Sequence, residues 1–410
     1  MQLEQHFADR MGALLGPDFP SDIALAVSGG GDSMAMLHLA AGWARRFGVR
    51  LWPVTVDHGL RDGSADEARL VADEARGLGL SHETLRWDGW DGSGNLQDAA
   101  RQARIDLIGG WAGAARPVLM AHTRDDQAET VLMRLMRGSG VDGLAGMRDR
   151  RDLPGGASVI RPLLEVRRSD LRRYLTVLRI PFVDDPGNDD PRFDRVKIRQ
   201  TIAALGLDVE RLARTADQMQ RVGEALTVRA AQARAALRRV TPPFYATFDR
   251  DALARIEAET RLRLVADALM EVGGQAYRPR LSALETAVET ALSGGQASLH
   301  GCLLVPQGAD LHICREWQAV RGLVTRPGAV WDSRWHVNGP ETPGAEVRAL
   351  GAEGLAQRPG WRDAGHPRAA LLASPAIWRG GDLLAAPLAG DKTGWSAQIV
   401  AESPLHGNAH

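Results

Sequence analysis

The feature that most constrains this chain is a run of three glycines with polar residues at both ends. It lies between an apolar run at 23–27 and an apolar helical stretch at 34–47, and comprises Ser28, Gly29, Gly30, Gly31, Asp32 and Ser33. Glycine lets a backbone turn sharply and lie close to an anion. The helix that follows offers N–H groups and the positive end of its dipole. A tight connection between a strand and a helix would also use glycine, so the run by itself allows both a phosphate-binding loop and a simple turn.

Apolar strands and helices alternate along the first half of the chain. After an expected helix at 1–16, we expect strands at 23–27, 51–56 and 117–121, and helices at 34–47, 64–77, 96–108 and 127–136. This alternation predicts an α/β fold built on a doubly wound parallel sheet with helices on both faces. Ligands bind such sheets beyond the carboxyl ends of the strands.

Two polar clusters follow the second and third expected strands, and thus fall at this edge of the sheet. Their members are Asp57, His58, His122, Asp125 and Asp126. Neighbouring carboxylates repel one another unless cations or hydrogen-bond donors compensate for their charge, so the clusters point to a functional site. The simpler alternatives are a turn after the second strand and a helix-capping role for Thr123 or Asp125.

The second half of the chain has a different pattern. Residues 209–240, 250–272 and 280–292 are predicted helices, and 297–315 is a predicted hairpin that turns at 306–310. After Pro327 the sequence is rich in glycine, proline and tryptophan, which indicates a small α+β terminal domain. We therefore predict three domains: 1–205, mainly helical 206–318 with its hairpin, and 319–410.

Several segments resemble the motifs of a known family. Residues 28–33 resemble the SGGxDS motif of the PP-loop ATP-pyrophosphatases, whereas the GxxxxGK(S/T) string of a P-loop is absent from the sequence. Further segments narrow the resemblance to the lysidine synthetases: 57–61 (DHGLR), 121–130 (AHTRDDQAET), 137–144 (RGSGVDGL) and 160–164 (IRPLL). The resemblance covers residues 23–199. Departures from the family pattern are Gln97 for glutamate, Ile105 for an aromatic residue, Gly187 for serine and Val196 for asparagine.

The resemblance implies a ligase that joins lysine to C2 of the wobble cytidine of the isoleucine tRNA with a CAU anticodon. ATP adenylates the base and is cleaved to AMP and pyrophosphate. The implied ATP-binding residues are Ser28, Gly29, Gly30, Gly31, Asp32 and Ser33, with Asp32 also holding Mg²⁺. The implied catalytic residues are Asp32, Asp57, His58, Arg101, Arg104, His122, Asp125 and Asp126. Contacts to tRNA or to free lysine are expected from Arg134, Arg137, Asp185, Asn188, Arg195 and Arg199.

Composition separates this prediction from its alternatives. The formal net charge is −1, so a polyanion site requires local clustering. Residues 148–179 supply it with nine arginines against four acids, although a solvated face is the simpler explanation. A thiolase with an iron–sulfur cluster would need cysteines near the motifs, but the two cysteines are Cys302 and Cys314. We therefore expect no iron–sulfur cluster, and we expect a cytoplasmic protein without a membrane span.

Two alternatives remain. A small-molecule amide-forming PP-loop enzyme would need an ammonia source and a different set of motifs. A nucleotide-binding module without catalysis would have no use for an intact set of carboxylates at Asp32, Asp57, Asp125 and Asp126. ATP consumption discriminates between the second alternative and an enzyme.

Overall fold

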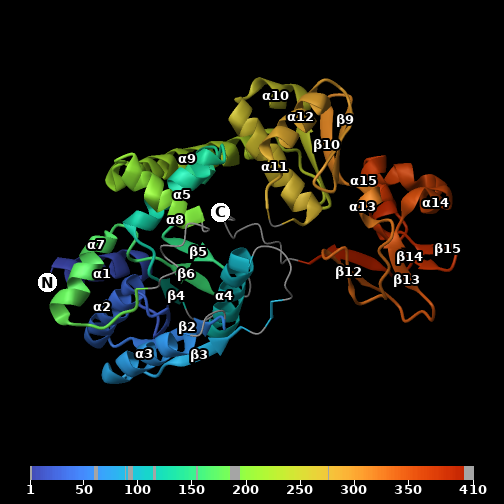
Figure 1. Cartoon of the computed structure of the whole chain (residues 1–410). Coiled ribbons are helices and arrows are strands. Elements are labelled where there is room, and N and C mark those ends of the chain that lie inside the picture. The colour runs from blue at the N-terminus through green and yellow to red at the C-terminus, as the bar shows by residue number, and fades with distance from the viewer. Residues whose placement is uncertain are drawn as a thin grey trace. The chain divides into compact units, whose positions relative to one another are not determined.

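The computed structural model describes residues 2–59, 63–87, 89–90, 96–113, 117–153, 156–184, 194–275 and 277–400 (Figure 1). Two compact units divide the chain, one up to Glu224 and the other from Ala225 onward. The boundary falls inside one long helix, α9 (Val209–Leu237). In the described residues, no helix has the length and apolar character needed to cross a membrane.

The first unit is built on a six-stranded sheet in the order β3-β2-β1-β4-β6-β5. Its strands are β1 (Asp22–Ala26), β2 (Arg50–Asp57), β3 (Glu83–Arg86), β4 (Pro117–Met120), β5 (Arg150–Asp152) and β6 (Ser158–Ile160). Neighbouring strands are parallel except for β5, which is antiparallel to β6. The predicted doubly wound parallel sheet is therefore confirmed, with one antiparallel edge strand.

The helices of this unit pack on both faces of the sheet or against one another. They are α1 (Gln2–Leu15), α2 (Gly31–Phe47), α3 (Ser64–Gly77), α4 (Leu96–Ala112), α5 (Arg124–Met136), α6 (Val141–Leu144), α7 (Arg168–Leu178) and α8 (Asp194–Ala204). Alternate residues of β1 face opposite sides, as the period of a strand requires. Ile23 and Leu25 pack in a core with α1, α2 and α7, whereas Ala24 packs in a second core with α4.

The second unit begins with helices around a four-stranded antiparallel sheet in the order β7-β10-β9-β8. The helices are α10 (Arg250–Arg255), α11 (Ala258–Gly273), α12 (Leu281–Leu292) and α13 (Trp317–Val320), and the strands are β7 (Tyr245–Asp249), β8 (Ala297–Leu299), β9 (Cys302–Gln307) and β10 (Asp310–Arg315). The predicted hairpin is confirmed as β9 and β10.

Two small antiparallel sheets follow, β11-β12-β16 and β13-β14-β15. Their strands are β11 (Val330–Trp331), β12 (Trp335–Asn338), β13 (Glu346–Ala349), β14 (Pro375–Arg379), β15 (Asp382–Ala385) and β16 (Ser396–Ile399), with helices α14 (Gly351–Ala356) and α15 (Arg368–Leu372). Phe244, Tyr245 and Cys314 join the same hydrophobic core as Trp331 and Trp335. The mixed α and β content is as predicted, while the boundaries at 205 and 318 stay a prediction.

Several expected helices differ from those observed. The helix predicted at 127–136 begins at Arg124, so that Asp125 and Asp126 belong to its first turn. The helix predicted at 250–272 is two helices, because Ile256 and Glu257 between them have extended φ and ψ angles. Asp249 starts the first of the two, since its carboxylate accepts a hydrogen bond from the N–H of Ala252 at 2.8 Å. The helix predicted from residue 34 begins at Gly31, so that Asp32 and Ser33 belong to its first turn.

Candidate active site

The glycine loop joins β1 to α2 at the carboxyl end of the central strand. Gly29 has a φ of 85°, a left-handed conformation that favours glycine. The hydroxyl of Ser33 accepts a hydrogen bond from the N–H of Ser28 at 3.1 Å and donates one to the carbonyl of Gly30 at 2.9 Å. These bonds fold the loop back on the helix start, so that the first turn of α2 opens toward the space above the sheet.

A segment distant in sequence forms the outer wall of this loop. The N–H of Val183 donates to the carbonyl of Gly29 at 2.9 Å, and Gly30 pairs with Val183 as a parallel bridge. A Cβ atom on Gly31 would lie 3.4 Å from the ring of Phe182. The loop is thus held between its own helix and the chain that follows α7.

The acidic cluster after β4 begins α5 with a reciprocal cap. The N–H and hydroxyl of Thr123 both donate to Oδ2 of Asp126 at 2.8 Å, and the N–H of Asp126 donates to Oγ1 of Thr123 at 3.4 Å. The expected capping role of Thr123 is therefore observed. It leaves Oδ1 of Asp126 available for other partners.

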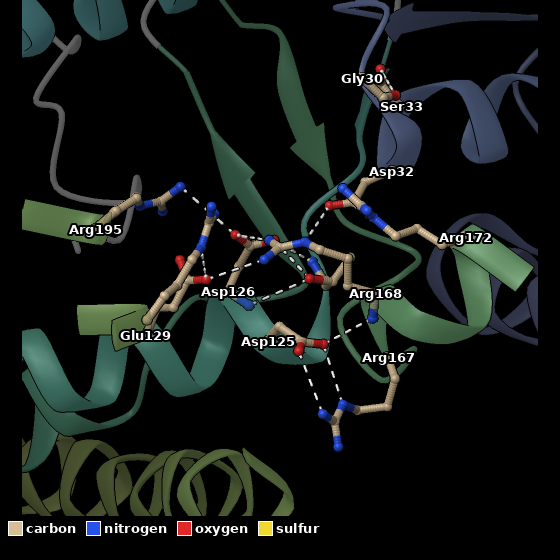
Figure 2. A network of polar contacts seen from close by, with 12 residues as sticks. Gly30, Asp32, Ser33, Asp125, Asp126, Glu129, Arg167, Arg168, Arg172 and Arg195 are labelled. Atoms are coloured by element: carbon tan, nitrogen blue, oxygen red, sulfur yellow. Dashed lines mark hydrogen bonds and ion pairs between the residues drawn. The ribbon is translucent and has the colours of Figure 1, made fainter. Parts of the chain in front are cut away.

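One arginine, Arg168, joins Asp32 of the glycine loop to the carboxylates of the cluster after β4 (Figure 2). Its Nε donates to Oδ2 of Asp32 at 2.8 Å, its Nη2 to Oδ1 of Asp126 at 2.9 Å and its Nη1 to Oε1 of Glu129 at 3.2 Å. The three acids come from α2 and α5, and Arg168 is the first residue of α7. A single guanidinium therefore links three helices around the site.

The neighbouring carboxylate, Asp125, holds Arg168 in place. Its Oδ2 accepts a hydrogen bond from the N–H of Arg168 at 2.8 Å, at the N-terminus of α7, and the Arg167 guanidinium lies 3.3 Å from the same oxygen. A carboxylate at the N-terminus of a helix is stabilised by free N–H groups and by the helix dipole. In this structure, the expected catalytic residue Asp125 positions the arginine that contacts the other acids.

The surroundings act differently on the two inner aspartates. Burial raises the pKa of the Asp32 carboxyl, although the charge and hydrogen bond of Arg168 oppose the shift. Burial also acts to raise the pKa of Asp126, but the charges of Arg168, Arg195 and His122 outweigh it and lower the pKa to about 2. Asp126 is therefore an anion throughout the physiological range of pH.

A pocket of about 480 Å³ opens beside this network at the carboxyl ends of β1, β2 and β4. One part of its wall is apolar and includes Val54, Val56, Ile108 and Met120. Another part is the glycine loop, and the charged lining comprises Asp32, Arg104, Asp126, Arg168, Arg172, Asp184, Arg195 and Arg199. An apolar wall beside an anion-binding loop suits a ligand with a flat base at one end and phosphates at the other.

Contacts with arginines determine which ring nitrogen carries the proton in neutral His58 and neutral His122. Nη2 of Arg104 lies 3.3 Å from Nε2 of His58, and Nε of Arg161 donates to Nδ1 of His122 at 3.2 Å. Because a guanidinium has no acceptor, neutral His58 carries its proton on Nδ1 and neutral His122 on Nε2. Burial, followed by the charge of Arg104, lowers the pKa of His58.

Asp57, the carboxylate next to His58, caps its own turn. Its Oδ1 accepts a hydrogen bond from the N–H of Gly59 at 2.9 Å. This bond, together with one from the Ser64 hydroxyl, lowers the pKa of Asp57. The turn expected as the simpler alternative is thus present, and it lies next to the histidine that Arg104 connects to the pocket.

Of the other arginines predicted to contact tRNA or lysine, two line the pocket, one binds backbone carbonyls and one lies on the surface. Arg195 and Arg199 line the pocket, where Nε of Arg199 donates to Oε1 of Glu129 at 2.6 Å. Arg134 is not among the residues that line the pocket, and its Nη1 donates to the carbonyls of Gly143 and Gly146 at 2.7 and 2.9 Å. Arg137 is exposed and lies 3.6 Å from Asp194.

Three predicted residues lie outside what the structure describes. Asp185 and Asn188 fall in the undescribed segment 185–193, and Arg101 belongs to α4 but its side chain is not described. Their roles stay predictions.

The residues that connect the glycine loop to the acidic cluster after β4 were not predicted from the sequence. Arg168 is one of the nine arginines expected to face a polyanion, yet it is committed to internal acids, and Arg161 of the same segment is buried. Glu129 lies within the 121–130 motif without a predicted role, although it is buried and accepts bonds from two arginines. Its i,i+3 spacing from Asp126 on a helix was the available signal.

The Asp32 carboxylate beside the glycine loop is a suitable ligand for a magnesium ion that binds together with a nucleotide. Magnesium is usually held by one or two carboxylates together with substrate phosphates. Asp32 supplies one carboxylate in the first turn of α2, next to the anion-binding loop. In the described part of the chain, no group of three or more histidine, cysteine, aspartate or glutamate side chains is arranged to hold a metal ion alone.

Comparison with known proteins agrees with this fold. Residues 3–205 match a family described as the PP-loop domain, so the chain is a PP-loop protein. Over 93% of its length the chain is 46% identical to the tRNA(Ile)-lysidine synthase of Ruegeria pomeroyi, covering 91% of that protein. Over 66% of the chain it is 43% identical to the tRNA(Ile)-lysidine synthase of a Bradyrhizobium species, covering 80% of that protein. The chain belongs to the tRNA(Ile)-lysidine synthase family.

Among solved structures, the U34-tRNA thiolase NcsA of Methanococcus maripaludis, with its 4Fe-4S cluster, matches with a TM-score of 0.45 and 16% identity. The match covers 54% of this chain and 79% of that chain.

Proposed function

We propose that this chain joins free lysine to C2 of the wobble cytidine of the isoleucine tRNA with a CAU anticodon, at the expense of ATP. Membership of the tRNA(Ile)-lysidine synthase family supports the reaction. The structural observation that carries it is one pocket that combines the glycine loop, an apolar wall and the Asp32–Arg168–Asp126 network. We propose tRNA, ATP and lysine as its substrates. We also propose that it acts in the cytoplasm, where these three are present together.

The glycine loop is the proposed site of the ATP phosphates. N–H groups in the first turn of a helix have no acceptor within the helix, and glycine lets phosphate oxygens approach them. Val54, Val56 and Ile108 would pack against the adenine. Magnesium held by Asp32 would neutralise charge on the phosphates and on the departing pyrophosphate.

The proposed chemistry has two balanced steps. The C2 oxygen of cytidine attacks the α-phosphorus of ATP, and pyrophosphate leaves. The ε-nitrogen of lysine then attacks C2, the bond from C2 to the adenylated oxygen breaks, AMP leaves with that oxygen, and the nitrogen loses a proton. Adenylation is needed because an amide-like oxygen is otherwise a poor leaving group.

The pocket residues would orient these reactants. Arg104, Arg195 and Arg199 line the pocket, and guanidinium groups pair well with phosphate oxygens. We assign contacts to tRNA or lysine to Arg195 and Arg199, and we retain Arg134, Arg137, Asp185 and Asn188 as further candidates. His122, with its proton on Nε2, would serve as a hydrogen-bond donor in the pocket. The second unit would bind other parts of the tRNA.

Mass spectrometry of nucleosides tests the reaction. The tRNA transcript is incubated with the protein, ATP, Mg²⁺ and lysine, then digested, and the nucleotide products are separated. We expect lysidine together with AMP and pyrophosphate. ADP as the main product would contradict PP-loop chemistry, sulfur or ammonia in place of lysine would indicate another PP-loop enzyme, and the absence of ATP consumption would indicate a binding module.

A wobble C-to-U transcript tests how the base is selected. Uridine also has a C2 oxygen, but cytosine donates at N4 where uracil accepts at O4. A buried site built for one pattern leaves polar groups unpaired with the other, which produces large rejection ratios. We expect lysine incorporation only into the cytidine transcript. Equal incorporation into both would place selection in the tRNA body.

A further inference from the structure

The Arg168 guanidinium uses its three nitrogens on three different acids, Asp32, Asp126 and Glu129. Its Cα is fixed as well, because its N–H is bound to Asp125. Arg168 therefore acts as a cation in the lining of the pocket, between Asp32 of the glycine loop and the acidic cluster of α5 (Figure 2).

Asp32 depends on Arg168 more than the other two acids do. Asp126 also lies 3.7 Å from Arg195, and Glu129 accepts a bond of 2.6 Å from Arg199. In the described part of the chain, Arg168 is the cation paired with Asp32. Removing Arg168 would leave Asp32 as an uncompensated buried anion, and would take one counter-charge from each of the other two acids.

A cation at Asp32 and a magnesium ion on the same carboxylate repel each other. Magnesium binds carboxylate oxygens at about 2.1 Å, whereas Nε of Arg168 lies 2.8 Å from Oδ2. Two cations this close destabilise each other strongly in a partly buried site. Magnesium binding at Asp32 is therefore disfavoured as long as Arg168 keeps its bond to this carboxylate.

We propose that Arg168 is a positioning residue that keeps the empty site neutral and excludes magnesium until the nucleotide arrives. While Arg168 is paired with Asp32, Asp126 and Glu129, free magnesium binds poorly. The triphosphate of an entering nucleotide is then not repelled by unpaired carboxylates. The negative charge of the entering phosphates then attracts both magnesium and the Arg168 guanidinium, which releases Asp32 for the metal. This inference rests on the proposed use of ATP and Mg²⁺.

Calorimetric titration of the nucleotide-free full-length protein with MgCl₂ tests the proposal without the reaction. Replacing Arg168 by methionine removes the charge and keeps most of the length, so Mg²⁺ affinity should rise by about tenfold or more. Arg168→Lys, which restores the charge, should return affinity toward that of the unmodified protein. Arg46→Met, exposed in the last turn of the helix that carries Asp32, is the matched control and should leave Mg²⁺ affinity unchanged.

A double substitution locates the effect. In Asp32→Asn combined with Arg168→Met, the gain in Mg²⁺ affinity should disappear. Unchanged Mg²⁺ affinity in Arg168→Met, or a gain that survives Asp32→Asn, would overturn the proposal. Failure of the protein to turn over ATP at all would instead refute the proposed function, because the titration contains no nucleotide.

The dependence of the KM for ATP on Mg²⁺ concentration is a further test. A purely structural role of Arg168 would not change this dependence. In Arg168→Met, the KM for ATP should rise about tenfold at limiting Mg²⁺ and recover as Mg²⁺ is raised, because added metal screens the exposed acids. A loss of kcat that is independent of Mg²⁺ would count against the proposal.

The unmodified protein provides a check should Arg168→Met fail to fold. In a crystal structure with Mg²⁺ and a non-hydrolysable ATP analogue, the distance from Nε of Arg168 to Oδ2 of Asp32 should exceed hydrogen-bond range, with the metal on Asp32. Retention of the 2.8 Å contact in that complex overturns the proposal, whether or not the metal lies on Asp32.

Discussion

Thr123 and Asp126 form a reciprocal capping box at the start of helix α5. The two oxygens of the Asp126 carboxylate therefore have different partners. Oδ2 accepts the N–H and the hydroxyl of Thr123, whereas Oδ1 accepts Nη2 of Arg168. The stability of the helix start and the electrostatics of the pocket therefore depend on one side chain.

Loss of this cap should affect both the helix start and the pocket. Thr123→Val keeps the shape of the buried side chain but removes the hydroxyl, so the free energy of unfolding should fall by about 1 kcal/mol. Activity should fall as well, since Asp126 is free to turn. Urea unfolding and AMP release measure the two effects, with Thr123→Ser as the control that keeps the hydroxyl. Full activity in Thr123→Val would mean that Asp126 needs no cap to be oriented.

Asp32→Asn should largely abolish turnover and leave the fold intact. The change removes the charge that would hold magnesium and alters no core volume, because Asp32 lies in the first turn of α2 at the pocket wall. AMP release over a range of Mg²⁺ concentrations measures the effect, and circular dichroism checks the fold. Asp73→Asn, on the exposed side of α3, is the control. Near-normal activity at saturating Mg²⁺ would exclude Asp32 as a ligand.

The arginine-rich segment should bind tRNA only through its exposed members. Replacing Arg150, Arg173 and Arg179 by glutamine should lower the log–log salt slope of tRNA binding by up to about 0.9 for each tRNA phosphate that the variant no longer binds. ATP affinity should change little. Filter binding at several salt concentrations measures the slope. The same substitutions at Arg46, Arg69 and Arg76 provide a charge-matched control outside the segment, and equal slopes for the two variants would place the tRNA elsewhere.

Glu271 should stabilise the second unit in a pH-dependent way. It accepts bonds from Arg238 at 2.6 and 2.7 Å and from Arg234 at 2.7 Å, which ties α9 to α11. Burial acts to raise its pKa, but the two arginines lower it overall. A lowered folded pKa gives stability that is present above the unfolded value of 4.5 and disappears as the pH falls below it.

Glu271→Gln should therefore cost about 1.5–3 kcal/mol at pH 7, the range for hydrogen bonds to charged groups. The difference from the unmodified protein should shrink when urea unfolding is repeated near pH 4. Glu285→Gln, on an exposed position of α12, should change little at either pH. A difference that does not vary with pH would mean that shape, and not charge, carries the effect.

The sheet was predictable from the sequence because its main strands are apolar and alternate with helices. The glycine loop and the two acidic clusters follow those strands, so topology alone brings them to one edge. Short elements such as Glu83–Arg86 and Arg150–Asp152 lack an apolar pattern, since each lies toward an edge of the sheet and is largely exposed. They were not predictable from periodicity.

The role of Arg168 was not predictable either, for a different reason. Its partner Asp32 is 136 residues away in sequence, and local charge in the 148–179 segment suggested a surface that faces a polyanion. Only the packing of α7 against α2 brings the two side chains together. The same holds for Arg161, which lies 39 residues from His122.

The dependence of the glycine loop on Val183 has a consequence for the order in which the site is made. During synthesis the loop leaves the ribosome long before Phe182 and Val183, which form its outer wall, and before Arg168, which neutralises Asp32. A nascent chain that ends before residue 168 therefore has the strands for its sheet but an open loop beside unpaired acids. The growing polypeptide gains a finished nucleotide site only after the segment behind α7 has emerged and docked.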